Sequence, residues 1–362
     1  ERALIFLVIS CPCALVISVP LTFFGGIGGA SREGILIKGA NDLETLAGVD
    51  TVVFDKTGTL TKGVFAVNAI HPEHMTEDAL LDIAAAAESY SSHPVAESIV
   101  DAHRGHIDKS RVGKVSELAG LGIEAVIDGE TLYVGNGALM EKVGADWHEC
   151  HLSGTVIHLA RKEEYLGHIV ISDELKPDAA AAVSALRALG IRKTVMLTGD
   201  NETTANAVRR KLDLDRVIAD VLPQDKERVV RELQAEGRKV IMVGDGINDS
   251  PALARADIGI AIGSGADIAV EEADVVLMKS DLNDVPTAIE CSRQTMRNIK
   301  QNLFWAFFYN TLGIPLAAGA LYPVWGITLN PMIGAAAMSL SSLFVVTNAL
   351  RLYRMRCDVP RR

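Results

Sequence analysis

The residues best suited to catalytic chemistry form the stretch DKTGTLT, from Asp55 to Thr61. It directly follows the apolar run 52–54 (VVF), which is typical of a buried parallel strand. A carboxylate at the end of such a strand lies at the edge of an open α/β sheet, where ligands bind. The threonines and the glycine behind it can offer hydroxyls and backbone N–H groups to a phosphate. An aspartate in this position can act as a nucleophile that accepts a phosphoryl group and forms an acyl phosphate.

A single aspartate at a strand end usually only caps a turn, so the prediction depends on the whole string. DKTGTLT resembles the phosphorylation signature of the P-type ATPases. The resemblance implies that Lys56 and Thr57 belong to the same catalytic site as Asp55. It also implies ATP as the phosphoryl donor and Mg²⁺ as the cofactor.

Two later strand-like runs also end in polar loops. Residues 194–197 (TVML) precede Thr198, Gly199 and Asp200, and residues 240–243 (VIMV) precede the loop GDGINDSP. Strands that each end in polar or acidic residues fit one sheet with one active edge. The set, in this order after DKTGTLT, resembles the haloacid-dehalogenase fold.

The resemblance to the haloacid-dehalogenase fold assigns a role to each polar loop. It implies that Thr198, within the loop Thr198-Gly199-Asp200, binds the phosphoryl oxygens and that Lys226 neutralises developing charge. Phosphoryl transfer depends mainly on positioning and charge neutralisation, and magnesium prefers carboxylate oxygens with waters. Taken singly, each residue is also compatible with a strand-end turn or a surface lysine. The implied Mg²⁺ ligands are Asp55, Thr57, Asp245 and Asp249.

An insert with a different sequence pattern, residues 64–165, separates the first strand from the later ones. It begins with a helix-like run at 79–89 and continues into SSHP, GLG and a strand pair that ends in YVGN. A histidine before proline is commonly only a helix-start loop. The three motifs together resemble the nucleotide-binding domain of the heavy-metal P-type ATPases, in which the histidine orients ATP and the glycines let the nucleotide approach the backbone. The residues implied to bind ATP are Glu88, His93, Gly120, Gly122, Gly135 and Asn136.

The two ends of the chain carry the elements that position this catalytic middle. Apolar runs at 3–30, 301–321 and 329–350 are long enough to cross a bilayer as helices. Positive residues near 297–300 and 351–362 mark the cytoplasmic side, so the spans run out-to-in, in-to-out and out-to-in. We therefore expect an integral membrane protein, in a bacterial plasma membrane, with its catalytic domains in the cytoplasm.

The first predicted span contains Cys11, Pro12 and Cys13. Proline opens a helix locally, and broken membrane helices occur where the freed carbonyls face a cavity or an ion. Two thiols at the break are soft ligands that suit Cu(I), Zn(II) or Cd(II). The alternative is a proline kink with two small buried cysteines, because buried cysteine is ordinary.

The last two predicted spans indicate which ion is transported. Tyr309 and Asn310, and Met338 with Ser342, resemble the seventh and eighth spans of the copper(I) ATPases. A thioether beside two thiolates is a soft set with little charge, which suits Cu(I). The alternative is that these polar groups only hold helices together. The run after Cys13 and residues 189–193 resemble the zinc and cadmium branch, so Zn(II) or Cd(II) export remains the runner-up.

The composition of the chain restricts the class of partner that it can have. The chain has 362 residues, 49% of them hydrophobic, and a formal net charge of -11, which argues against a nucleic-acid partner.

The chain begins with Glu1 and holds neither Thr-Gly-Glu nor Cys-x-x-Cys, so we expect a fragment that lacks the early spans and the actuator domain. Such a piece is expected to bind ATP without completing a pumping cycle. The expected partners are ATP, a heavy-metal ion, the lipid bilayer and a metallochaperone.

The expected fold class is an α/β haloacid-dehalogenase-like phosphorylation domain with an inserted α+β nucleotide-binding domain, flanked by transmembrane α-helices. A different class, a membrane-anchored phosphatase of the same fold, usually carries a second acid two residues after the nucleophile. That position is Thr57 here, which favours a persistent phosphoenzyme. The expected domains are 1–50 (first span and stalk), 51–63 plus 166–290 (phosphorylation), 64–165 (nucleotide binding) and 291–362 (two spans and tail).

Overall fold

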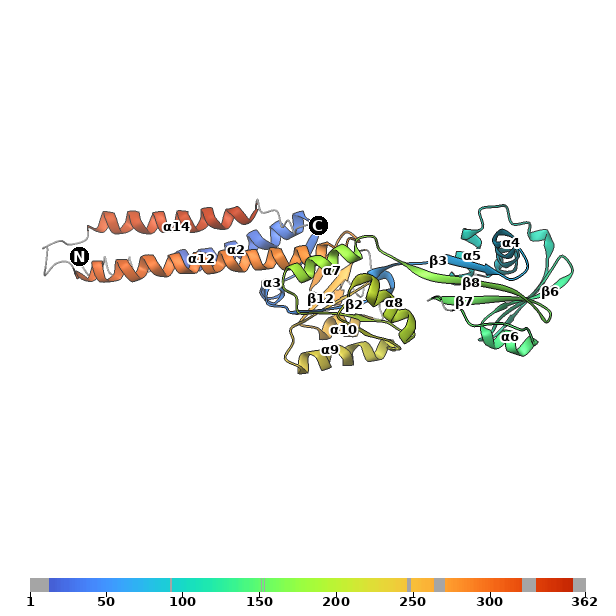
Figure 1. The fold of residues 1–362 in the computed structure, drawn as a ribbon. Helices are drawn as coiled ribbons and strands as arrows, with labels where there is room; N and C mark the ends of the chain where they lie inside the picture. The colour runs from blue at the N-terminus through green and yellow to red at the C-terminus, as the bar shows by residue number, and fades with distance from the viewer. Residues whose placement is uncertain are drawn as a thin grey trace.

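The computed structural model describes residues 13–91, 93–150, 152, 154–245, 249–263, 271–320 and 330–353. The described part is elongated (Figure 1). Long helices occupy one end, a seven-stranded sheet lies in the middle, and a six-stranded sheet forms the other end. The two sheets are joined through a long pair of strands, β3 and β8, that leaves the central domain side by side.

The seven-stranded sheet carries the phosphorylation motif. Its order is β1-β13-β12-β11-β2-β9-β10, and all neighbours are parallel except the edge pair β1 and β13. β2, β11 and β12 are buried along their whole length, as expected for central strands covered on both faces. The strands are β1 (Ile35–Ile37), β2 (Thr51–Asp55), β9 (Lys193–Leu197), β10 (Arg216–Ile218), β11 (Val240–Gly244), β12 (Ile258–Ile262) and β13 (Val275–Leu277).

Helices cover both faces of this sheet, and each face has its own apolar core. Phe54 and Met196 pack with α3, α7, α8 and the start of α12 on one face. Val53 and Met242 pack with α9 and α10 on the other. The helices are α3 (Ala40–Ala47), α7 (Ala179–Ala188), α8 (Glu202–Leu212), α9 (Lys226–Ala235) and α10 (Ser250–Arg255).

The six-stranded sheet is antiparallel, in the order β3-β8-β7-β6-β5-β4. One face packs against α4 and α5, and the other against α6 and the segment that follows it. Thr76 begins α4 as an N-cap, with its hydroxyl accepting from the Ala79 N–H. The elements are β3 (Thr61–Pro72), α4 (Glu77–Glu88), α5 (Pro94–Ala102), β4 (Val112–Leu118), β5 (Gly122–Ile127), β6 (Glu130–Gly135), α6 (Gly137–Val143), β7 (Thr155–Arg161) and β8 (Glu164–Leu175).

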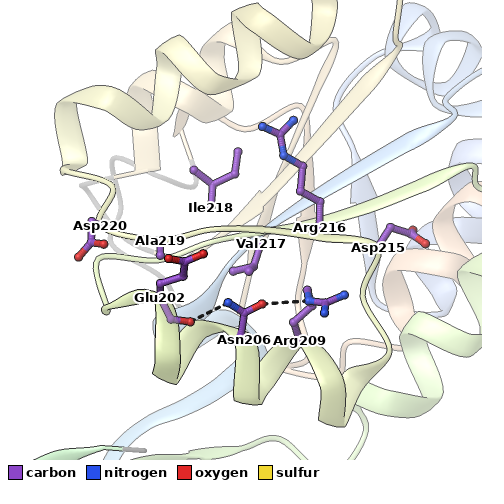
Figure 2. Close-up of a pocket in the computed structure, with 9 residues that line it drawn as sticks. All are labelled: Glu202, Asn206, Arg209, Asp215, Arg216, Val217, Ile218, Ala219 and Asp220. Carbon is purple, nitrogen blue, oxygen red and sulfur yellow. Dashed lines mark hydrogen bonds between the residues drawn. The ribbon is translucent and has the colours of Figure 1, made fainter.

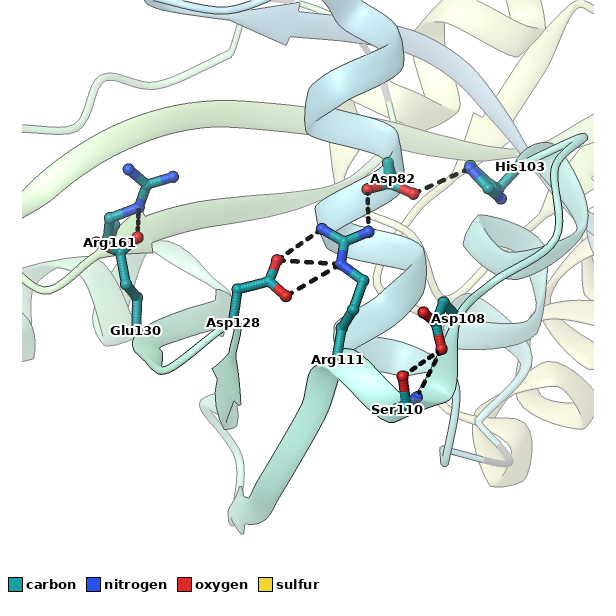
Figure 3. Close-up of polar contacts among 8 residues, drawn as sticks. All are labelled: Asp82, His103, Asp108, Ser110, Arg111, Asp128, Glu130 and Arg161. Carbon is teal, nitrogen blue, oxygen red and sulfur yellow. Dashed lines mark hydrogen bonds and ion pairs between the residues drawn. The ribbon is translucent and has the colours of Figure 1, made fainter.

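Arg111 ties the start of β4 to two other elements of this domain (Figure 3). Its guanidinium donates to both carboxylate oxygens of Asp128, in the β5–β6 turn, and to Asp82 of α4 at 2.8 Å. His103 also lies 3.3 Å from Asp82. Because the fork geometry fixes direction as well as distance, this cluster holds α4 against the outer strands.

Within the described ranges, three helices form the other end of the molecule: α2 (Cys13–Arg32), α12 (Asp284–Ala318) and α14 (Pro331–Tyr353). Asn302 of α12 joins them, since its amide donates to Thr22 Oγ1 of α2 at 3.2 Å and accepts from Asn348 Nδ2 of α14 at 2.8 Å. Buried amides of this kind hold helices together in an apolar environment.

Among the helices of the described ranges, only the stretch Met332–Tyr353 is long and apolar enough to cross a membrane. The span predicted at 3–30 is described only from Cys13 onward, as α2, and the span predicted at 301–321 forms the second half of α12. Over their described residues, neither meets the same requirement. The span predicted at 329–350 corresponds to α14.

The expected fold class is confirmed, but two strands lie elsewhere than the sequence suggested. Residues 35–37, placed in the stalk, form β1 and close one edge of the seven-stranded sheet. Residues 167–171, assigned to the phosphorylation domain, belong to β8 of the six-stranded sheet. The physical reason is that β3 and β8 pair from Thr61 to Pro72, with two shifts of register on the way, so the junction between the two domains runs along a strand pair.

Candidate active site

The ends of three neighbouring parallel strands gather the candidate catalytic side chains. Asp55 is the last residue of β2, Thr198 directly follows β9, and Asp245 directly follows β11. Asp55 lies level with Leu197 across the β2–β9 pair, and β11 is in register with β2 on the other side. All three side chains therefore lie at one edge of the sheet, as the sequence predicted.

Lys226, the first residue of α9, lies between two of the carboxylates. Its ammonium donates to Asp55 Oδ1 at 2.6 Å and to Asp249 Oδ1 at 2.7 Å. All three side chains are buried. Burial alone would lower the pKa of Lys226, but the charges of Asp55 and Asp249 raise it, so the lysine stays protonated.

Negative charge exceeds positive charge in this cluster. The carboxylates of Asp55, Asp245 and Asp249 each present an oxygen within 4.8 Å of the others. Burial, and then the Asp249 charge, raise the pKa of Asp55 to about 6, and the same two causes raise that of Asp245. Converging carboxylate oxygens are the donor set that Mg²⁺ prefers, so these three residues fit the predicted ion.

The turn after the nucleophile brings its backbone close to Asp245. Gly58 has φ +74°, and a β-carbon there would lie 1.7 Å from Asp245 Oδ2. Thr61 holds the turn, because its hydroxyl donates to the Lys56 carbonyl at 2.9 Å and accepts from the Gly58 N–H at 3.2 Å. Thr57, predicted both as catalytic and as a magnesium ligand, has an exposed side chain at the outer side of this turn.

Lys56 and Asp200 form the second charged pair of the site. Lys56 Nζ lies 2.6 Å from Asp200 Oδ2, and the buried Thr198 hydroxyl accepts from the Asp200 N–H at 3.1 Å. Lys56 and Asp200 also line a cleft of about 430 Å³ between α8 and the strands β3, β7 and β8. The loop Thr198–Asp200 is thus held by internal bonds at the mouth of a cleft large enough for a nucleotide.

The sequence analysis did not predict two of the residues that lie near this edge of the sheet. The half-buried Asp173 of β8 shares the single hydroxyl proton of Thr61 with the Lys56 carbonyl and so ties the phosphorylation turn to the strand pair that carries the second domain. Lys176 is also half-buried, and burial lowers its pKa. Its positive charge in turn acts to lower the pKa of Asp245. The stretch DELKP follows a strand-like run, which is the signal that could have drawn attention to both.

Four of the six predicted nucleotide residues lie together at one end of the six-stranded sheet. Asn136 Nδ2 donates to the Gly120 carbonyl at 2.9 Å, and Gly122 pairs with Gly135 across β5 and β6. Gly122 has φ +142°, and a β-carbon there would lie 2.1 Å from the Val134 carbonyl oxygen. The glycines therefore let two backbones approach closely, while Asn136 also caps α6 by accepting from the Leu139 N–H.

Glu88 and His93 flank the connection between α4 and α5. His93 is exposed and caps α5, because its Nδ1 accepts from the Val95 N–H at 3.2 Å. Glu88, the last residue of α4, is only 9% exposed. Burial raises the pKa of Glu88 to about 7, so the carboxyl is protonated in about half of the molecules at neutral pH.

We expect Glu88→Gln to stabilise the protein at alkaline pH. A carboxyl with a raised folded-state pKa binds its proton more tightly when folded, so its contribution to stability falls as pH rises from about 4.5 to about 7. The advantage of Glu88→Gln should therefore grow by about 2 kcal/mol between pH 5 and pH 8. Urea unfolding followed by Trp fluorescence measures it, with the exposed Glu97→Gln as control. An advantage independent of pH would contradict the assignment.

We expect Asn136→Ala to weaken nucleotide binding by about tenfold, because both the α6 cap and the bond to Gly120 are lost. Titration of the chain with ATP, followed by calorimetry, gives the affinity. Thr76→Ala is the matched control, since it removes a cap from α4 in the same domain without touching the glycine turn. Equal losses in the two variants would show that Asn136 acts only through domain stability.

The predicted membrane ligands fall on three helices that pack together. Cys11 lies outside the described residues, and of Cys13 only the backbone, at the start of α2, is described. Asn310 of α12 and both Met338 and Ser342 of α14 are partly buried. Tyr309 is 41% exposed and packs edge-on against Phe308 of α12. Their convergence on one ion stays a prediction.

A further hollow, of about 450 Å³, lies at the outer edge of the seven-stranded sheet (Figure 2). It lies between β10 and α8, where Asn206 donates to the Glu202 carbonyl and accepts from Arg209. None of the predicted site residues lines it. We therefore assign the chemistry to the edge that carries Asp55.

Comparisons with known proteins agree with this geometry. Residues 49–257 match the haloacid dehalogenase-like hydrolase family. The copper-exporting P-type ATPase of Vibrio cholerae is 47% identical over 355 residues, which cover 96% of this chain and 39% of that protein. The cadmium, zinc and cobalt-transporting ATPase of Bacillus subtilis is 45% identical over 98% of this chain and 50% of that protein.

Solved structures give the same result. A zinc-transporting PIB-type ATPase in the E2.Pi state superposes with a TM-score of 0.84 and 38% identity, over 98% of this chain and 58% of that one. The catalytic domain of the CPx-ATPase CopB-B matches with a TM-score of 0.58 and 30% identity, over 72% of this chain and 96% of that domain. The chain thus spans half or less of the length of the curated relatives named above. It belongs to the haloacid dehalogenase-like hydrolase family and, within it, to the heavy-metal P-type ATPases.

Proposed function

We propose that this chain carries the catalytic domains and part of the membrane domain of a pump. The pump uses ATP to export a soft heavy-metal ion, Cu(I). The observation that carries the proposal is the cluster of Asp55, Lys226 and Asp249 at the edge of the sheet, next to the cleft that Lys56 and Asp200 line. Its catalytic domains would lie in the cytoplasm, where ATP is, beside a bacterial plasma membrane. ATP, the metal ion and the bilayer are its proposed partners, together with a metallochaperone that delivers the ion.

The proposed reaction transfers the γ-phosphoryl group of ATP to Asp55. A carboxylate oxygen of Asp55 forms a bond to the γ-phosphorus while the bond from that phosphorus to the β–γ bridging oxygen breaks, and ADP leaves with the electron pair. Lys226 neutralises charge beside the attacking oxygen, and the Thr198 loop orients the phosphoryl oxygens. Mg²⁺ held by Asp55, Asp245 and Asp249, with Thr57 nearby, would neutralise the phosphate charge.

The alternative, a membrane-anchored phosphatase, is disfavoured by the side chain at position 57. A phosphatase of this fold needs an acid there to protonate the leaving group and then activate water. Thr57 supplies neither function, and its side chain is exposed. A phosphoenzyme formed at Asp55 should therefore persist, which is what coupling to ion movement requires.

The choice of Cu(I) depends on the ligand types of the predicted membrane site. Cys11, Cys13 and Met338 are soft donors, and Tyr309, Asn310 and Ser342 add no formal charge. The named relatives include a copper exporter, a cadmium, zinc and cobalt transporter and a zinc transporter, so relatedness alone supports either class of ion. Export of Zn(II) or Cd(II) is the alternative.

We expect Cu(I) to raise the amount of acid-stable phosphate that the chain takes from ATP in reconstituted vesicles, and Zn(II) to raise it less. Radiolabelled ATP, acid quenching and gel autoradiography measure this directly. The double variant Cys11→Ser/Cys13→Ser should lose the metal stimulation but keep ATP binding. Stimulation by Zn(II) alone would reverse the choice of ion, and stimulation that survives in the double variant would refute the proposed ligands.

A further inference from the structure

Three histidines lie side by side on one face of the six-stranded sheet. His71 of β3 is the direct cross-strand partner of His168 of β8, and His168 is the direct partner of His158 of β7. Direct partners in an antiparallel pair place their side chains on the same face, about 5 Å apart. The ring centroids are accordingly 4.9 Å apart for His71 and His168 and 5.5 Å apart for His158 and His168. His158 and His168 are almost fully buried.

A cysteine from another element completes this cluster. Cys150 follows α6 and its thiol is free and half-buried. One ligand atom from each of His71, Cys150 and His168 lies within 4.8 Å of the other two. His148, two residues before Cys150, stacks its ring edge-on at 5.3 Å from the His168 ring and is held by Glu73 at 2.8 Å.

The hydrogen bonds behind the cluster leave one nitrogen of His168 free to bind an ion. The Tyr165 hydroxyl lies 3.1 Å from His168 Nδ1 and 2.8 Å from His158 Nδ1. A hydroxyl can accept one bond and donate another, so His168 Nδ1–H can donate to Tyr165 while Tyr165 donates to His158. In that arrangement His168 Nε2 carries a lone pair. A metal-binding histidine is typically fixed in this way by a bond from its other nitrogen.

We propose that His71, Cys150 and His168 form a second metal site, in the nucleotide-binding domain, for a borderline divalent ion of the Zn²⁺ type. Two imidazoles and one thiolate are the donors that such ions take, and three protein ligands leave a tetrahedral position for water. The site is separate from the carboxylates around Asp55.

The position of the site gives it a structural consequence for nucleotide binding. His158 is the cross-strand partner of Gly135, and Trp147 packs against His158 at 4.9 Å between ring centroids. A β-carbon on Gly137 would lie 2.4 Å from the same indole. An ion held by Cys150 would therefore fix the segment that runs from the predicted nucleotide residue Asn136, through α6, back to the sheet.

The test uses Co²⁺ as a probe, because thiolate ligation to Co²⁺ gives a near-ultraviolet charge-transfer band. The full chain in detergent, with Cys11→Ser/Cys13→Ser to remove the thiols of the first helix, is titrated with Co²⁺. We expect a thiolate band that saturates at one equivalent. In the same background Cys150→Ser should abolish the band, and His71→Asn should weaken Co²⁺ binding by about tenfold or more.

The controls separate ligation from folding. His74→Asn replaces an exposed histidine three residues from His71 and should leave Co²⁺ affinity unchanged. Because Cys150 is half-buried and His71 is exposed, their variants should keep the ATP affinity of the parent when Co²⁺ is absent. The proposal is overturned if the background chain shows no thiolate band, if the band survives Cys150→Ser, or if His71→Asn and His74→Asn weaken binding equally.

Discussion

Replacing Asp55 by Asn is expected to abolish the acid-stable label that the chain acquires from ATP. An amide cannot form the acyl phosphate, yet Asn has nearly the same volume and can still accept from Lys226, which lies 2.6 Å from Asp55 Oδ1. The fold should therefore persist while the label falls below detection. Incubation with γ-labelled ATP and Mg²⁺, acid quenching and gel autoradiography give the result, and the parent label should be released by hydroxylamine, as an acyl phosphate is.

Asp50→Asn is the matched control for this experiment. Asp50 precedes the same strand at its opposite end, where its carboxylate accepts from Thr51 and from the Lys239 N–H. The same change of charge is thus made one strand length away from the site. Asp50→Asn should keep most of the label. A label that persists in Asp55→Asn would refute the assigned nucleophile, and equal losses in both variants would show that charge alone governs labelling.

Replacing Gly58 by Ala is expected to reduce phosphorylation at least about 100-fold, since a displacement of roughly 1 Å at a reacting centre has an effect of that order. Two physical causes act together. A non-glycine residue at φ +74° is strained by about 1–2 kcal/mol, and the new methyl group would lie 1.7 Å from Asp245 Oδ2. Either the turn or the Asp245 carboxylate must move, and both belong to the phosphoryl-transfer edge. The initial rate of label incorporation at saturating ATP measures the loss.

Gly190→Ala separates strain from contact in this prediction. Gly190 has φ +79°, close to the value at Gly58, but a β-carbon there meets nothing within 4 Å. Its substitution should lower stability by a similar backbone strain while leaving the rate of phosphorylation within about twofold of the parent. If the two variants phosphorylate at similar rates, then the close approach of the turn to Asp245 is not needed for the reaction.

The sequence alone was enough to predict which polar side chains gather at one edge of the seven-stranded sheet. Asp55, Thr198 and Asp245 each follow a short apolar run, and parallel strands necessarily present their carboxyl ends at one edge of a sheet. The glycines at 120, 122 and 135, with Asn136, were likewise identified from local motifs. These features depend on residues that are close in sequence, so a pattern along the chain is enough to identify them.

The tertiary structure decided what depends on pairing between distant segments. Lys226 reaches Asp55 only because α9 packs on one face of the sheet, and Asp173 reaches Thr61 only because β3 and β8 pair along their length. The register of β3, β8 and β7 likewise places His71, His168 and His158 in one row, although they are up to 97 positions apart in the chain. Local spacing cannot set such a register, because it is fixed by the packing of whole strands against α4, α5 and α6.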